Sequence, residues 1–372
     1  MNPSRILFVA NDPLFATCYG EALAKAGFHV NVALDGESAL PRIQEGQVDL
    51  VVIDLLLPGI QSSQVIAAIR ENKSTRSLPI IALPTELEPL AQAAHEAGVT
   101  KRLERFANPV ATLINAVESF KEGSPAVART EPAQASKEWL KQCAVELPTR
   151  IVRLRRALQN TRQQTGQSGL FGELLQEVHQ LCELSILIGR KPIFQLASAL
   201  ESLVFDLDTL PQQATLSTVR TVGQAIDLLD TLLGGDRWTR LKILNESQIL
   251  VVDDDANARQ LITAAMQLVT LSATSAATPE ATLSIVKRAP FDLIFLDIGL
   301  PGMNGFELCT KIRALPAHRD TPIVFLTGMA TFQNRVQSSL SGGNDFIGKP
   351  FNIPELGVKA LLWAFKGQLA SV

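Results

Sequence analysis

Acidic, hydroxyl and basic side chains stand at the ends of short apolar runs in the last third of the 372-residue chain. Six residues share this placement: Asp253, Asp254, Asp255, Asp297, Thr327 and Lys349. If the runs are parallel strands, their carboxyl ends meet at one edge of a sheet, so these side chains converge. Crowded carboxylates require a cation, and a site with few hard oxygen ligands favours Mg²⁺. A lysine and a hydroxyl beside such a site suit phosphoryl transfer, which depends mainly on positioned charges.

The elements that position these side chains are predicted from the apolar pattern. Nearly continuous apolar runs are typical of strands covered on both faces, and they predict strands at Ile249–Val252, Phe291–Leu296, Ile323–Leu326 and Asp345–Ile347. Helical patterns lie between and after them, at Ala256–Val269, Pro279–Arg288, Gly305–Ala314, Thr331–Ser341 and Ile353–Phe365. This alternation predicts an α/β fold with a doubly wound parallel sheet.

An internal repeat shows that the chain carries this domain twice. Ile6–Val9 returns as Ile249–Val252 and Asp49–Asp54 returns as Asp292–Asp297, both with an offset of 243 residues. We therefore expect a first copy at 1–122 and a second at 247–372. Linkers are expected at 123–136 and 235–246, and the segment 137–234 between them contains no strand-like run and predicts helices throughout.

The second copy resembles bacterial response-regulator receiver domains. Four blocks carry the resemblance, in the family's order and spacing: Val251–Asp255, Asp297–Gly305, Leu326-Thr327-Gly328 and Lys349-Pro350-Phe351. The resemblance implies that each copy is a five-stranded, flavodoxin-like receiver domain. It also implies a two-component signalling protein that accepts a phosphoryl group, with slow self-dephosphorylation, rather than an enzyme.

The same resemblance implies a role for each site residue. Asp297 would be the nucleophile that accepts phosphoryl from a phosphohistidine, and Asp253, Asp254, Asp297 and the Gly299 carbonyl would hold Mg²⁺. Thr327 would hydrogen-bond the phosphoryl oxygens and Lys349 would pair with them. Phe346 would be the aromatic residue that turns inward on activation, and the peptide bond between Lys349 and Pro350 would be cis.

Three other interpretations of the acidic cluster fit the sequence less well. A merely solvated cluster would require four independent coincidences. The phosphatase pattern D-x-D-x-T fails because positions 299 and 301 are Gly and Pro. A flavin site would need a phosphate-binding loop, and this sequence lacks one because the turn after the first strand is acidic.

The first copy has lost most of these residues. The offset aligns Asp253 and Asp254 with Ala10 and Asn11, and Asp255 with Asp12. Thr327 aligns with Pro84, with Thr85 one place late. Lys349 aligns with Asn108, although Lys101 or Arg102 could replace it. Asp54 remains, so residues 1–122 are predicted to be a degenerate receiver that binds a partner, or else a structural cap.

The helical middle contains His179, which is singled out among four histidines. His29, His95 and His318 are predicted at the surface. The predicted helix Phe171–Ile188 carries an apolar stripe, and His179 falls at its flank, where an exposed imidazole could carry a phosphoryl group.

The segment is similar to histidine phosphotransfer (HPt) domains, which are four-helix bundles. The residues that carry this similarity are His179-Gln180-Leu181, Gly189, Ile193, Leu196-Ala197 and Leu200-Glu201, with Val219-Arg220 and Ala225–Leu229 later, which resemble the family's final helix. Where the family has Lys and Gly three and four places after the histidine, this chain has Cys182 and Glu183, and the glutamate would repel phosphate. A bundle kept for dimerisation or spacing is the alternative.

Composition narrows the function further. The net charge of −3 gives no field that would favour nucleic acid or anionic membranes. The sequence contains no signal pattern and no apolar run of membrane length, which predicts a cytoplasmic protein.

The expected partners are a sensor histidine kinase or phosphotransfer protein and a downstream protein, and homodimerisation is left open. Three functions remain: a phosphorelay response regulator, a scaffold that recruits signalling partners, and an intramolecular relay between His179 and Asp297.

Overall fold

The structure, a computed structural model, describes residues 5–83, 87–103, 109–120, 137–163, 170–234, 239, 241, 244, 247–328 and 341–370. By its internal contacts the chain forms two compact units. One comprises Met1–Thr149 with His179–Gly189, and the other Arg150–Val178 with Arg190–Val372. The predicted linker 123–136 and most of the predicted helix Thr331–Ser341 lie outside the described residues.

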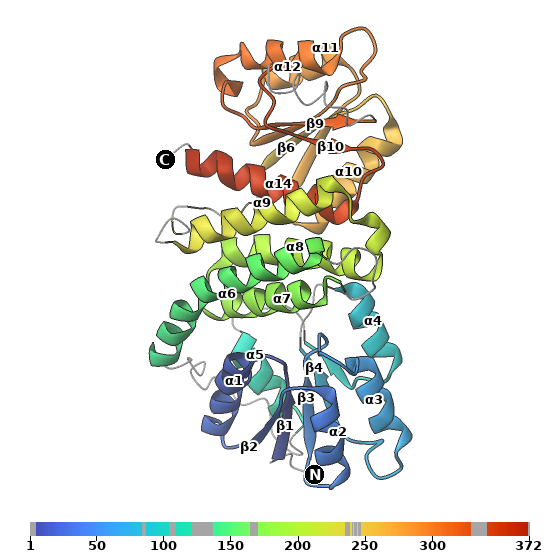
Figure 1. The fold of residues 1–372 in the computed structure, drawn as a ribbon, viewed down its shortest axis with the longest axis vertical. Helices are drawn as coiled ribbons and strands as arrows, with labels where there is room; N and C mark the ends of the chain where they lie inside the picture. Colours follow the sequence, from blue (N-terminus) through green and yellow to red (C-terminus); the bar gives the residue numbers. More distant parts are fainter. Residues whose placement is uncertain are drawn as a thin grey trace. The chain divides into compact units, whose positions relative to one another are not determined.

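The first unit contains a five-stranded parallel sheet. Its strands are β1 (Arg5–Val9), β2 (His29–Ala33), β3 (Leu50–Ile53), β4 (Ile80–Ala82) and β5 (Lys101–Arg102), in the order β2-β1-β3-β4-β5. The helices between and after them are α1 (Pro13–Lys25), α2 (Gly36–Gln44), α3 (Ser62–Glu71), α4 (Glu88–Glu96) and α5 (Pro109–Glu118). Helices α1 and α5 pack together, and α3 packs against both α2 and α4 (Figure 1).

The second unit contains an equivalent sheet. Its strands are β6 (Gln248–Val252), β7 (Ser272–Ala276), β8 (Leu293–Asp297), β9 (Ile323–Thr327) and β10 (Asp345–Gly348), all parallel, in the order β10-β9-β8-β6-β7. Its helices are α10 (Ala256–Leu268), α11 (Pro279–Val286), α12 (Gly305–Arg313) and α14 (Ile353–Ala370). The two sheets have the same strand order, and both are the predicted doubly wound, flavodoxin-like type.

Among the described residues between the two sheets in the sequence there are four α-helices, in agreement with the predicted helical middle: α6 (Lys137–Gln163), α7 (Gly172–Leu187), α8 (Lys191–Thr209) and α9 (Leu216–Leu233). Within the second unit, α8 and α9 pack against each other and against α14 (Figure 1). No helix in the described part of the chain is long and apolar enough to cross a membrane.

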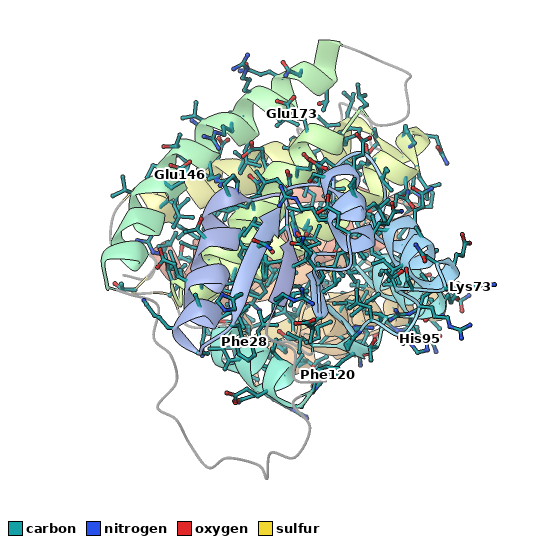
Figure 2. All side chains as sticks on the ribbon, turned by 90° about the horizontal axis from the view of Figure 1, so that it is seen from below. Phe28, Lys73, His95, Phe120, Glu146 and Glu173 are labelled. Atoms are coloured by element: carbon teal, nitrogen blue, oxygen red, sulfur yellow. The ribbon has the colours of Figure 1, made fainter. Side chains whose placement is uncertain are left out.

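Two histidine predictions are confirmed and one is wrong. His29 and His95 are exposed, and Figure 2 shows His95 at the outside of α4. His318 is fully buried instead. Both of its ring nitrogens have polar neighbours: Nε2 lies 2.9 Å from the Val286 carbonyl oxygen and Nδ1 lies 3.2 Å from Thr321 Oγ1.

Candidate functional site

The loop after β6 fixes the first acidic residue of the site. Asp253 is fully buried, and its Oδ1 accepts a hydrogen bond from the Asp255 amide at 3.0 Å. Arg259 Nη1 donates to the carbonyl oxygens of Asp253 and Asp254, at 2.8 and 2.9 Å. The carboxylate of Asp255 accepts the Asn257 amide at 2.9 Å and caps α10, so it serves the helix rather than the site. Asp254 is exposed beside the buried Asp253.

Asp297 ends β8 beside these two carboxylates. It is 5% exposed, and one carboxylate oxygen from each of Asp253, Asp254 and Asp297 lies within 4.8 Å of the others. The turn after β8 is tight, because a Cβ built on Gly305 would stand 2.2 Å from the Asp297 carbonyl oxygen. Only glycine allows α12 to begin this close to the strand end. A Cβ on Gly299 would lie 3.3 Å from Asp297 Oδ2, so this glycine also lines the carboxylate.

Thr327 and Lys349 complete the edge of the sheet. Thr327 ends β9, is 4% exposed, and accepts the Lys349 amide at its carbonyl oxygen at 2.7 Å. Lys349 Nζ lies 2.8 Å from Asp253 Oδ2 and 3.1 Å from Asp297 Oδ1. The peptide bond between Lys349 and Pro350 is cis, as predicted. The structure therefore brings together Asp253, Asp254, Asp297 and Lys349 at one sheet edge, with Thr327 on the adjoining strand end.

The charges of this cluster shift two ionisations. Burial raises the pKa of Asp297, and the charges of Asp253 and Asp254 raise it further, although Lys349 acts in the opposite direction. Burial acts to lower the pKa of Lys349, but its hydrogen bonds and charge interactions with Asp253 and Asp297 outweigh burial and raise it. Lys349 thus stays protonated, and Asp297 ionises less readily than an ordinary aspartate.

The donor set fits a divalent cation with hard oxygen preference. Two buried carboxylates and one exposed carboxylate converge, and carboxylate oxygens are the ligands that Mg²⁺ prefers in proteins.

Phe346 and Asp345 lie on β10, just before Lys349. The Phe346 ring is half-buried and packs on the core beneath α12, and the Arg220 guanidinium lies over it, 4.4 Å from the ring centroid. Asp345 is buried and forms an ion pair with Arg220. The sequence predicts no contact between Arg220 and Asp345, since nothing in their spacing indicates that α9 and β10 meet.

The first sheet has a different set at the equivalent edge. Ala10 and Asp12 are buried and Asn11 is half-buried, so no acidic pair follows β1. Asp12 Oδ1 accepts the Phe15 amide at 3.4 Å, in the first turn of α1. Asp54 is 3% exposed, and its Oδ1 accepts the Leu56 amide at 3.0 Å.

The expectation that Lys101 could replace Lys349 is wrong. Lys101 pairs with Ile81 in the sheet, whereas Asp345 pairs with Val324, the residue 243 places after Ile81. Lys101 therefore stands at the position of Asp345, four residues before Lys349.

Arg102 is excluded on the same grounds. It follows Lys101, is exposed, and stands at the position of Phe346. Pro84, Thr85 and Asn108, the other expected counterparts, lie outside the described residues.

His179 is not the exposed imidazole that was expected. His179 is 6% exposed, and its Nε2 lies 3.1 Å from Asp54 Oδ2, a residue of the same unit. Glu183 Oε1 lies 3.6 Å from the same nitrogen, one helical turn further along α7. Glu183 was expected to repel phosphate, and it joins His179 and Asp54 in a second group of potential ligand atoms within 4.8 Å of one another.

The comparisons with known proteins agree with this geometry. The family model of the response regulator receiver domain matches residues 6–118 and 249–360, and the chain belongs to this family. It is similar to the transcriptional regulatory protein ResD of Bacillus subtilis, 40% identical over 120 residues, which are 32% of this chain and 49% of that protein. It is also similar to SrrA of Staphylococcus aureus, 35% identical over 118 residues, which are 31% and 48% of the two chains.

The chain thus spans about half the length of these curated relatives. Among solved structures, the chemotaxis response regulator CheY4 of Vibrio cholerae matches at 30% identity and a TM-score of 0.30, covering 31% of this chain and 95% of that one. The two matches to the family model show two receiver domains in this chain, and a helical region separates them in the sequence.

Proposed function

We propose that this chain is a phosphorelay response regulator that accepts a phosphoryl group on Asp297, from a sensor histidine kinase or a phosphotransfer protein. One observation carries the proposal: Lys349 Nζ contacts both Asp253 and Asp297 where three carboxylates converge. An aspartate flanked by carboxylates and a lysine is suited to phosphoryl transfer, because the developing charges are balanced on the spot.

The chemistry assigned to the residues is a simple displacement. A carboxylate oxygen of Asp297 attacks the phosphorus of a phosphohistidine, so an O–P bond forms, the P–N bond breaks, and the imidazole leaves and takes up a proton. Lys349 neutralises the phosphoryl oxygens, and the Thr327 hydroxyl donates a hydrogen bond to one of them. Asp253, Asp254 and the Gly299 carbonyl, with Asp297, would hold Mg²⁺, which supplies further charge neutralisation when bound.

Labelling with acetyl phosphate in Mg²⁺ tests the proposal. We expect Asp297→Ala to lose the label. The matched control is Asp54→Ala, at the equivalent position of the first sheet, which should keep the label. A label that persists in Asp297→Ala would contradict the assignment. A wild-type label that resists hydroxylamine would also contradict it, because an acyl phosphate is labile to hydroxylamine.

A second function is favoured by the contact of His179 with Asp54. We propose that the helices of residues 137–234 act as an HPt-like module in which His179 carries a phosphoryl group. The intramolecular partner expected for His179 is Asp297, and the 3.1 Å contact with Asp54 supports Asp54 as an alternative partner. Incubation with a phosphorylated kinase or receiver should label wild type and Asp297→Ala on histidine. If His179→Gln is labelled equally, the relay is refuted.

The scaffold remains the alternative for the output. In that function the degenerate receiver and the helices recruit signalling proteins, and the phosphorylation of Asp297 is incidental. Retention of signalling by Asp297→Ala in a cell that requires this chain would favour the scaffold over the phosphorelay.

A further inference from the structure

The final helix of the second receiver is buried on more than the side that faces its sheet. In α14 the buried residues occur at ten positions: Glu355, Leu356, Gly357, Val358, Lys359, Ala360, Leu361, Leu362, Ala364 and Phe365. A helix on the outside of a doubly wound sheet normally keeps a polar face in water. Here that face is covered, because α8 and α9 of the same unit pack against α14 (Figure 1).

Specific polar contacts accompany this packing. Ser217 and Thr221, one turn apart on α9, both donate to Glu355 Oε1, at 2.6 and 2.8 Å. Gln213 Oε1 accepts from Asn352 Nδ2 at 2.7 Å, just before α14 begins. Such a matched set of hydrogen bonds indicates a specific interface rather than an incidental contact.

The same interface also reaches strand β10, which leads to Lys349. Arg220, on the same helix α9, pairs with the buried carboxylate of Asp345 and covers the ring of Phe346. These two residues begin β10, which ends at Gly348, directly before Lys349, whose Nζ contacts Asp297. The backbone of β10 is bonded to β9 up to Thr327, so a shift at Lys349 and Thr327 is carried along the strand pair to Phe346.

From this continuity we infer that Arg220 couples the phosphorylation of Asp297 to the chain's own helical region. The face formed by β10 and α14 has an intramolecular occupant, helices α8 and α9, and Arg220 is the positioning residue that joins Phe346 to α9. A phosphoryl group on Asp297 draws Lys349 toward its oxygens, the β10 end moves, and the Arg220 contact changes with it. The inference rests on the proposed function, since it requires that Asp297 accept the phosphoryl group.

Hydrogen exchange of the full chain tests the coupling, with Mg²⁺ and beryllofluoride as the phosphoryl mimic. We expect beryllofluoride to change the exchange rates of amides in α9, Leu216–Leu233, and we expect Arg220→Ala to remove this change. By linkage, Arg220→Ala should also shift the affinity for beryllofluoride by about 5-fold or more.

A matched control is Arg155→Ala. Arg155 also forms ion pairs with α9, to Asp227 at 2.9 Å and Asp230 at 2.8 Å, but on its exposed side. This control should keep the response of α9 and leave the affinity within about 2-fold. Phe346→Leu is a second variant, which guards against a folding defect in Arg220→Ala. It removes the ring under Arg220 but keeps the ion pair between Arg220 and Asp345, and it should also weaken the exchange response of α9.

The outcomes separate the two proposals. If ¹⁹F NMR shows beryllofluoride bound at Asp297 while α9 exchange is unchanged in wild type, the coupling is refuted and the proposed function stands. The coupling is also refuted if Arg220→Ala and Arg155→Ala respond alike. If no bound beryllofluoride is seen, the proposed function fails, and the coupling fails with it.

Discussion

Lys359 and Asp345 form a buried ion pair between α14 and β10. The Lys359 side chain is fully buried, and its Nζ donates to Asp345 Oδ2 at 2.6 Å. Trp363 Nε1 donates to the same oxygen at 3.2 Å, and Arg220 pairs with the other oxygen. Burial lowers the pKa of Lys359, although the charge of Asp345 and its hydrogen bond raise it. We predict that Asp345→Asn strongly destabilises the second unit.

The magnitude follows from the position of Lys359. Without Asp345 the ammonium must remain buried and poorly compensated, or lose its proton. A pH of 7 lies roughly 3.4 pH units below the ordinary lysine pKa, and each unit corresponds to about 1.4 kcal/mol, so removing the proton from the ammonium at pH 7 costs about 5 kcal/mol. Removing one partner of a buried pair usually costs about 3–5 kcal/mol. We therefore expect the free energy of unfolding to fall by about 3–5 kcal/mol.

A double-mutant cycle distinguishes the ion pair from general disturbance of the core. Lys359→Met removes the buried charge and keeps most of the side-chain volume, so Asp345→Asn combined with Lys359→Met should be less destabilised than Asp345→Asn alone. Arg220 does not limit this recovery, because its side chain is 39% exposed and can turn to solvent.

Urea unfolding followed by the fluorescence of Trp363 measures the effect locally, in a background where Trp139 and Trp238 are replaced by Phe. A loss of less than about 1 kcal/mol in Asp345→Asn, or a double variant as unstable as the sum of the singles, would refute the reasoning.

Three further predictions concern the site. Gly305→Ala should lower the free energy of unfolding of the second unit by about 1–3 kcal/mol in urea and reduce acetyl phosphate labelling, because its Cβ would meet the Asp297 carbonyl oxygen at 2.2 Å. The control is Gly328→Ala, whose Cβ meets nothing within 4 Å and which should change the free energy of unfolding by less than about 0.5 kcal/mol. Burial raises the pKa of Asp297, so the folded protein keeps this proton at pH values where the unfolded chain has lost it, and the group's contribution to stability falls as the pH rises from the ordinary aspartate pKa through the folded pKa. Carboxyl NMR without metal should show a titration midpoint for Asp297 above the ordinary aspartate value, and a still higher midpoint in Lys349→Met. An unchanged or lower midpoint in Lys349→Met would contradict the argument. Chelation by EDTA, or Asp253→Asn, should lower acetyl phosphate labelling by about 10-fold or more, and labelling that is insensitive to both would exclude the magnesium site.

The second sheet and its site could be predicted because their determinants are local. Apolar runs identify the buried strands, and a parallel sheet brings their carboxyl ends together, so Asp253, Asp297 and Lys349 converge in the structure as expected. Strand β7 was missed, because Ser272–Ala276 is an edge strand with mostly accessible residues and has no apolar run to mark it.

The remaining errors come from contacts between elements far apart in the sequence. The helical pattern of α7 places His179 at the flank of an apolar stripe, but it does not say that Asp54 lies over that flank. Residue types around Arg220 likewise give no sign of Phe346, more than a hundred positions away. The pairing of Lys101 was misjudged because strand register depends on hydrogen bonds across the sheet.

The burial of α14 has a consequence for anyone who dissects this chain. A fragment that starts at residue 247 keeps every residue of the phosphorylation site, but it strips α8 and α9 from α14 and leaves apolar surface bare. Such a fragment is expected to self-associate or precipitate, and its surface would offer false binding sites in an interaction screen. A fragment that starts before Lys191, the first residue of α8, keeps that surface of α14 covered.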